Sequence, residues 1–248
     1  MITKTNILLA IFILIIILGC KMDKDDGTVK NLKFSIAKKI PVPEPSGLDL
    51  AFDETGFWVV SDENSTVYLL DSWGKEVKRF KVDGDDLEGI TVVDETKLAV
   101  VLERKREVVV LDTSGTELKR AKLELTGELN SGLEGITYDP EQKKFYLVNE
   151  KDPILLLTLD ENLAELNRDT INFLKDASGI YFDSADNKLW ILSDENQVIV
   201  KTNLSGNEIY EKYVIKVEQP EGITFNKEGN RFYLVSDIQG SLYVFNLE

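Results

Sequence analysis

Residues with metal-binding side chains recur along the chain in one local setting, directly before a glycine and an aliphatic residue. Glutamate fills this position at Glu88, Glu134 and Glu221, and serine fills it at Ser46 and Ser178. Carboxylate oxygens are the ligands that calcium, magnesium and manganese prefer. Three glutamates brought together would repel one another by about 2 kcal/mol per pair at a separation near 8 Å. A bound cation would offset that repulsion, and so would hydrogen bonds from amides or hydroxyls.

A second set of acids follows the first by 15 or 16 residues, each at the end of an apolar run. The set comprises Asp62, Glu103, Glu150, Asp194 and Asp237. We interpret these acids as staples of the fold that accept hydrogen bonds from a neighbouring repeat, whereas we interpret the glutamates of the first set as a cation or ligand site. Arg104 and Lys151 follow two of the acids directly. They are interpreted as solvated surface charges, with positive charge beside the same carboxylates as the alternative.

Composition excludes several function classes. The sequence has no histidine and a single cysteine, so His-dependent catalysis, intrachain disulfides and the usual zinc sites are ruled out. The net charge is −15, and removal of the N-terminal segment with Lys4 would leave 28 − 44 = −16. Such a chain is expected to bind no nucleic acid and to be repelled by anionic lipid head groups. No organic cofactor is expected.

The repeats that carry these residues predict the fold. The glycine-containing unit recurs at intervals of 42, 46, 44 and 43 residues, a period typical of four-stranded propeller blades. Each unit opens a β pattern, which a polar turn and further apolar runs follow. We therefore predict an all-β, five-bladed β-propeller over residues 32–248. A pair of all-β sandwiches is the alternative, but it does not explain five equal repeats.

The last repeat has only three strands before the chain ends. The segment 32–42 has the polar character of an outer strand, and we predict that it completes the last blade beside residues 241–247. This closure would cover an open sheet edge. The recurring glycines would allow the innermost strands to approach closely at the axis. The aromatic residues Trp58, Tyr146, Trp190 and Tyr233 are predicted to pack between blades.

Antiparallel pairing of the first two strands would place the two sets of acids opposite each other. Ser46 would then face Asp62, and Glu88 would face Glu103. Because the first strand of a blade lines the central channel, the recurring glutamates and serines are expected to form an inner ring at one mouth. The second set of acids would form a ring just outside it.

The N-terminal residues predict export and a membrane anchor. One lysine precedes an apolar run from Ile7 to Leu18, which is too short to span a bilayer and fits a signal peptide. Residues 17–20 resemble the bacterial lipobox, which implies cleavage after residue 19 and a lipid on Cys20. We predict a signal peptide over 1–19 and a lipidated tether over 20–31. Lys21 favours the outer membrane, if the organism has one.

Several motifs together resemble the SdiA-regulated family: DLEGI at 86–90, LEGITYD at 133–139, ASGIYFD at 177–183, LWILSDEN at 189–196 and QPEGITF at 219–225. The resemblance covers residues from about 32 to 248. It implies a β-propeller, often exported or membrane-attached, with calcium at the channel on Glu88, Glu134 and Glu221. It implies no catalytic residues, and the two serines of the inner ring would make any metal site lopsided.

Two functions of different class follow. The first is a monomeric, non-catalytic envelope protein that is anchored to a membrane and binds a small ligand or a partner protein. The second is a calcium-dependent hydrolase of the lactonase or phosphoesterase type, in which a cation would activate water and Glu103 or Glu150 would act as base. A purely structural envelope protein is a third possibility.

Overall fold

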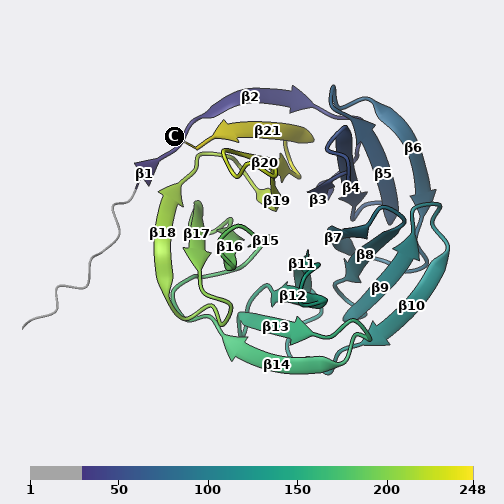
Figure 1. Ribbon diagram of the computed structural model, residues 1–248, viewed down its shortest axis with the longest axis vertical. Coiled ribbons are helices and arrows are strands. Elements are labelled where there is room, and N and C mark those ends of the chain that lie inside the picture. The colour runs from purple at the N-terminus through teal and green to yellow at the C-terminus, as the bar shows by residue number, and fades with distance from the viewer. Residues whose placement is uncertain (1–29, 248) are drawn as a thin grey trace, which may run out of the picture.

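The computed structural model describes residues 30–247, which form five β-sheets arranged as a ring about a central axis (Figure 1). These residues contain strands and turns but no helix. Accordingly, none of them belongs to a helix able to cross a membrane. The predicted signal peptide and Cys20 lie outside the described residues.

Each sheet is one blade of the propeller, with its strands running in order from the axis to the rim. Blade 1 comprises β3 (Pro45–Leu50), β4 (Gly56–Ser61), β5 (Thr66–Asp71) and β6 (Glu76–Lys81). Blade 2 comprises β7 (Leu87–Asp94), β8 (Lys97–Leu102), β9 (Glu107–Asp112) and β10 (Glu117–Lys122). Blade 3 comprises β11 (Leu133–Asp139), β12 (Lys144–Asn149), β13 (Leu155–Leu159) and β14 (Glu165–Thr170). Blade 4 comprises β15 (Gly179–Asp183), β16 (Lys188–Ser193), β17 (Val198–Thr202) and β18 (Ile209–Val214). Blade 5 comprises β19 (Pro220–Phe225), β20 (Arg231–Ser236), β21 (Ser241–Asn246) and β2 (Phe34–Lys39).

The ring closes as predicted, because an N-terminal strand completes the C-terminal blade. Strand β2 pairs antiparallel with β21, with Phe34 opposite Phe245 and Lys39 opposite Ser241. Figure 1 shows β2 on the outside of blade 5. The two ends of the described chain therefore hold each other, and the five-bladed prediction is confirmed.

The chain also makes a contact that the sequence did not indicate. Strand β1 (Lys30–Asn31) pairs in parallel with β18 of blade 4, and the Leu32 amide donates to the Val214 carbonyl. The segment thus crosses from blade 4 to blade 5 before it forms β2 (Figure 1). The last two residues of the predicted tether, Lys30 and Asn31, consequently belong to the propeller.

Five apolar clusters fill the five interfaces between blades. Inner and middle strands such as β8 are buried along almost their whole length, because both faces of each sheet pack against neighbouring blades. Trp58, Tyr146 and Trp190 are buried in these clusters, and Tyr233 packs at the edge of one. The predicted packing role of these aromatic residues is confirmed.

A buried carboxylate in blade 1 ties three blades together. The Asp49 carboxylate accepts hydrogen bonds from the Val92 amide (2.8 Å) and the Thr91 hydroxyl (3.1 Å) of blade 2. It also accepts from the Thr224 hydroxyl of blade 5 (2.7 Å) and from the Leu50 amide (2.8 Å). Burial raises the pKa of Asp49. Four donors to one carboxylate identify Asp49 as a structural staple.

The inner strands approach one another where the recurring glycines lie, as predicted. A Cβ atom on Gly89 would lie 2.6 Å from the Glu134 carbonyl oxygen of the next blade, and one on Gly47 would lie 2.3 Å from the Glu88 carbonyl oxygen. These distances are far shorter than van der Waals contact. Glycine is required here by close backbone approach at the axis.

Candidate functional site

A crater of about 360 Å³ opens at one end of the propeller axis. Every residue of the two predicted rings lines it. Its wall carries eleven carboxylates and only two basic side chains, Arg104 and Lys151. Below the crater the channel narrows to about 10 Å³ between the glycines and aliphatic residues that follow the inner ring. That space holds about one water molecule, so the channel is much narrower here than in the bowl of the crater.

The two rings are not in direct register, which corrects the predicted pairing. In blade 2, Leu87 pairs with Leu102 and Ile90 pairs with Val100, so Glu88 and Gly89 lie opposite the single residue Val101. The same one-residue shift occurs at the start of β3, β11 and β19. This is a β-bulge, which bends the strand and redirects a side chain. The inner-ring residue of each of these four blades therefore lies at a bulge.

In the four bulged blades, a different residue lies opposite the outer-ring acid. The Glu103 amide donates to the Asp86 carbonyl (2.9 Å), and the Glu150 amide donates to the Gly132 carbonyl (2.8 Å). The partner is thus two residues before the inner-ring position. Asp86 and Asp176, which occupy this position in blades 2 and 4, both line the crater. Sequence reasoning missed them, although their constant offset from the inner ring was visible.

The three inner-ring glutamates have no hydrogen-bond donor among residues 30–247. Glu88 is only 9% exposed, yet its carboxylate has neither a hydrogen bond nor an ion pair there. Burial, followed by the charges of Asp62 and Glu103, raises the pKa of Glu88 well above its ordinary range. Burial likewise raises the pKa of Glu134, and it raises the pKa of Glu221 to about 8.

The inner-ring serines are satisfied instead by the neighbouring blade. The Ser46 hydroxyl donates to the Leu87 carbonyl (2.7 Å), and the Ser178 hydroxyl donates to the Pro220 carbonyl (2.8 Å). Each of these contacts joins one blade to the next. The serines therefore act as staples at the positions where the other three blades carry carboxylates.

The outer-ring acids have mixed surroundings, so the staple interpretation holds for only part of the set. Glu103 accepts a hydrogen bond from the Gly132 amide of blade 3 (3.0 Å), as a staple between blades would. Asp194 accepts one from the Gln197 side chain in its own turn (3.0 Å). By contrast, one buried carboxylate oxygen of Asp62 and one of Asp237 have no partner in the described chain.

Arg104 and Lys151 contribute positive charge to the crater wall. The Arg104 Nε lies 2.8 Å from an Asp86 carboxylate oxygen, and the Lys151 Nζ lies 2.6 Å from a Glu150 carboxylate oxygen. Lys151 also lies 3.6 Å from Glu195. Their interpretation as plain solvated surface charges is therefore wrong. Each is partly exposed and partly neutralises one side of the bowl.

Two groups of carboxylates in the crater are close enough to share a cation. One comprises Asp86, Glu88 and Glu103, and the other comprises Glu103, Glu134 and Glu150, with ligand oxygens within 4.8 Å of one another in each group. Glu103 belongs to both groups. Glu221, the third member of the predicted set, lines the crater but belongs to neither. The structure thus joins inner-ring and outer-ring residues into one carboxylate cluster centred on Glu103.

Comparison with known proteins agrees with this architecture. The family model described as SdiA-regulated matches residues 27–246, which is nearly the whole chain. The chain belongs to the SdiA-regulated family. The resemblance noted from the EGI-type motifs is therefore confirmed, and the five-bladed propeller is the fold of this member of the SdiA-regulated family.

Solved structures share the fold at low sequence identity. A glutaminyl cyclase from Myxococcus xanthus is similar with a TM-score of 0.67 and 11% identity, over 88% of this chain and 99% of that one. A nidogen/laminin complex contains a chain with a TM-score of 0.62 and 16% identity, over 84% and 77%. Hydrazine synthase from Kuenenia stuttgartiensis gives 0.55 and 15%, over 79% and 56%. At such identities these likenesses show the fold alone.

The raised pKa values predict how the stability of this SdiA-regulated protein depends on pH. Burial, with neighbouring carboxylates, raises the pKa of Glu221 to about 8, of Glu103 to about 7 and of Asp62 to about 6. The folded state then binds more protons than the unfolded state, so stability is fully present at about pH 4 and falls as pH rises through these values.

We expect the metal-free protein to lose about 2 kcal/mol of unfolding free energy between about pH 5 and about pH 8, after allowance for screening in the open crater. Urea unfolding in the presence of a chelator measures this difference. Glu221→Gln should reduce this loss of unfolding free energy, because it removes the carboxyl group with the highest of the three pKa values. Stability that rises over this interval would contradict the assignment.

Proposed function

We propose that this protein is a membrane-anchored binding module of the bacterial cell envelope, whose crater binds a calcium ion through the cluster around Glu103. The ion, in this proposal, helps to hold a small ligand or a partner protein at the mouth of the propeller. The observation that carries the proposal is the gathering of inner-ring and outer-ring carboxylates, with oxygens within 4.8 Å of one another, around Glu103. Three glutamates are held at the axis, and no donor in the described chain reaches any of them.

Two other acids, Asp49 of blade 1 and Asp176 of the crater, show that this fold can satisfy a buried carboxylate when its role is structural. Asp49 accepts four hydrogen bonds, and Asp176 accepts three, from the Ser193 hydroxyl and the amides of Asp194 and Glu195. Glu88 and Glu134 lack such partners in residues 30–247. Carboxylates that lack internal donors repel one another when they ionise, so their retention at the axis favours an external cation.

The donor set suits calcium. Calcium takes six to eight oxygen ligands in flexible geometry, and carboxylates with water fill such a shell. Five acids of the two overlapping groups supply anionic oxygens, while Arg104 and Lys151 draw charge from Asp86 and Glu150 at the sides. The crater volume of about 360 Å³ leaves room beside an ion for water or a ligand group.

A calcium titration followed by thermal unfolding tests the proposal. Saturating calcium should raise the unfolding temperature of the chelator-treated protein by roughly 5 °C or more, as expected for binding linked to folding. Sodium chloride of equal ionic strength is the control for screening. The absence of any shift with calcium, magnesium or manganese would contradict the cation site. Turnover of a lactone or phosphoester by the calcium-loaded protein would support the hydrolase instead.

The anchor is a separate part of the proposal and rests on the sequence alone. The apolar run that ends at Gly19-Cys20 supports lipidation of Cys20 after cleavage. We expect the wild-type chain to remain with the membrane fraction after a high-salt wash and to incorporate labelled palmitate. Cys20→Ser should abolish the labelling. Labelled palmitate in the Cys20→Ser chain would contradict the assignment.

A further inference from the structure

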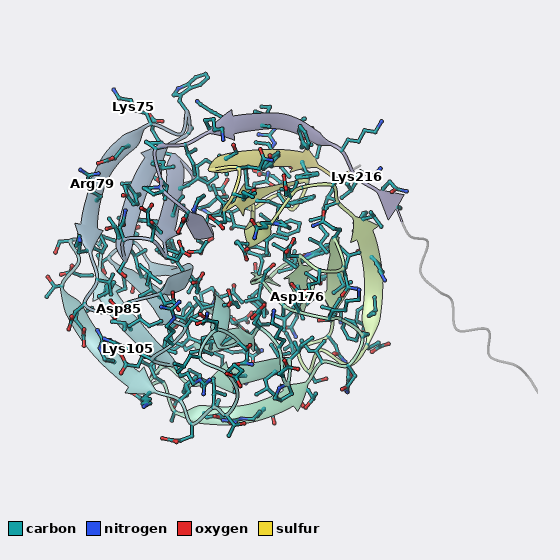
Figure 2. All side chains as sticks on the ribbon, turned by 180° about the vertical axis from the view of Figure 1, so that it is seen from behind. Lys75, Arg79, Asp85, Lys105, Asp176 and Lys216 are labelled. Atoms are coloured by element: carbon teal, nitrogen blue, oxygen red, sulfur yellow. The ribbon has the colours of Figure 1, made fainter. Side chains whose placement is uncertain are left out.

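The outer edge of the propeller around β2 carries positive charge in an otherwise acidic protein. Residues 30–43 contain four lysines and no acidic residue, whereas the whole chain has a net charge of −15. Lys75, in the turn between β5 and β6, extends this charge onto blade 1, and it lies at the rim in Figure 2. We call this surface the lysine rim; it comprises Lys30, Lys33, Lys38, Lys39 and Lys75.

The lysine rim has no internal counter-charge in the described chain. None of its five lysines lies within ion-pair distance of a carboxylate of residues 30–247, although eight basic residues elsewhere on the propeller do so, among them Lys97 and Arg120. All five lysines are exposed. The Lys39 ammonium donates to the Gln239 carbonyl, but no carboxylate of residues 30–247 neutralises any of the five, so their charge can attract an external anionic surface.

Apolar side chains are interspersed with these lysines. Trp73 is 76% exposed and stands beside Lys38, whose Nζ lies 5.9 Å from the indole ring centre. Ile36 and Phe34, on β2, are 55% and 44% exposed. A tryptophan among lysines is typical of surfaces that contact a bilayer. The indole ring then lies at the level of the head groups, and the lysine ammonium groups point toward the lipid phosphates.

We propose that the lysine rim, with Trp73, docks onto a bilayer surface that contains anionic phospholipid. The position of the rim in the chain supports a bilayer as the occupant, because the segment proposed to carry the lipid on Cys20 directly precedes β1 and β2 in the sequence. Eleven of the 44 acidic residues line the crater at the axis and not this edge. Screening over roughly 10 Å lets the bilayer sense the nearby lysines rather than the net charge.

Docking by the rim would set the propeller on its edge. The crater would then open along the membrane surface, where a soluble ligand could reach it. From its composition, the chain was expected to be repelled by anionic lipids. That repulsion would apply to the crater but not to the lysine rim. The choice of a bilayer as the occupant rests on the proposed anchor at Cys20, but the contact itself needs no lipid on that residue.

Vesicle sedimentation of a chain that begins at Lys21 tests the docking. This chain cannot be lipidated and contains every strand of the five blades. It should pellet with vesicles of phosphatidylcholine and phosphatidylglycerol but not with phosphatidylcholine alone. Replacing Lys33, Lys38, Lys39 and Lys75 by glutamine should weaken this binding by about tenfold or more. Equal binding by this variant would overturn the proposal.

A matched variant controls for net charge. Glutamine at Lys122, Lys143, Lys144 and Lys175 changes the charge by the same amount. These lysines lie on blades 2 and 3 and the loop before blade 4, and all are exposed except Lys144, which is half-buried. Its binding to the anionic vesicles should stay within about twofold of the unsubstituted chain. A loss as large as that of the rim variant would show a diffuse charge effect and overturn the docking surface.

Tryptophan fluorescence gives a second readout, because Trp73 is exposed while Trp58 and Trp190 are 5% and 2% exposed. Anionic vesicles should shift the Trp73 emission to shorter wavelength, and brominated lipid should quench it. An unchanged spectrum on pelleted vesicles would overturn the role of Trp73. Protection of Trp73 that depends on protein concentration without vesicles would show that a second copy covers the rim, and would also overturn the proposal.

Discussion

Glu103→Gln should lower calcium affinity by about 100-fold or more, because it removes the one carboxylate shared by both potential ligand groups. The glutamine oxygen can still accept the Gly132 amide, so the contact between blades 2 and 3 should persist. Removing a carboxylate whose pKa is raised to about 7 by burial should leave the metal-free protein at least as stable at neutral pH. Isothermal titration with calcium measures the affinity.

Two further variants make this result specific. Glu195→Gln removes a partly exposed crater carboxylate that belongs to neither group, and it should change affinity by less than about threefold. Glu221→Gln tests the inner-ring set inferred from the sequence. If Glu221→Gln costs as much as Glu103→Gln, the ion sits on the axis among the three glutamates. If Glu103→Gln has no effect, the cluster centred on that residue is wrong.

Gly89→Ala should lower the free energy of unfolding by about 3 kcal/mol, since the new Cβ would lie 2.6 Å from the Glu134 carbonyl oxygen. The opposing atom is backbone at the axis, where strands of all five blades crowd together. Neither side can move without displacing the bulges that hold the inner ring. For a domain of this size the change corresponds to roughly 6–12 °C in unfolding temperature.

Gly240→Asn is the matched control for Gly89→Ala. Gly240 has a φ of +49° and no atom within 4 Å of its Cβ position, and asparagine tolerates this left-handed conformation. We expect a change below about 1 kcal/mol, measured by urea unfolding without metal. Should Gly89→Ala be no worse than this control, the axial strands are more widely spaced than the structure shows.

Patterns within the amino-acid sequence were enough to predict the architecture. Three features led to the prediction of five blades closed by β2: the repeat period, the alternation of the strands and the missing fourth strand of the last repeat. Each of these features can be read from residues that are close together in the sequence. The glycine before each aliphatic residue revealed close approach at the axis for the same reason. The acids of both rings were also visible as a repeated offset from these glycines.

The tertiary structure decided how those acids meet. A one-residue bulge at the start of four inner strands shifts the register, so that Glu103 pairs across the strands with Asp86 rather than Glu88. Carboxylates from repeats more than 40 residues apart come within 4.8 Å only through packing between blades, and no local pattern encodes that distance. Packing between blades likewise determines that the Asp49 carboxylate accepts four hydrogen bonds, whereas the Glu88 carboxylate accepts none from the described chain. The sequence by itself therefore determined which residues form the rings, and the assembled propeller decided which of them could hold an ion.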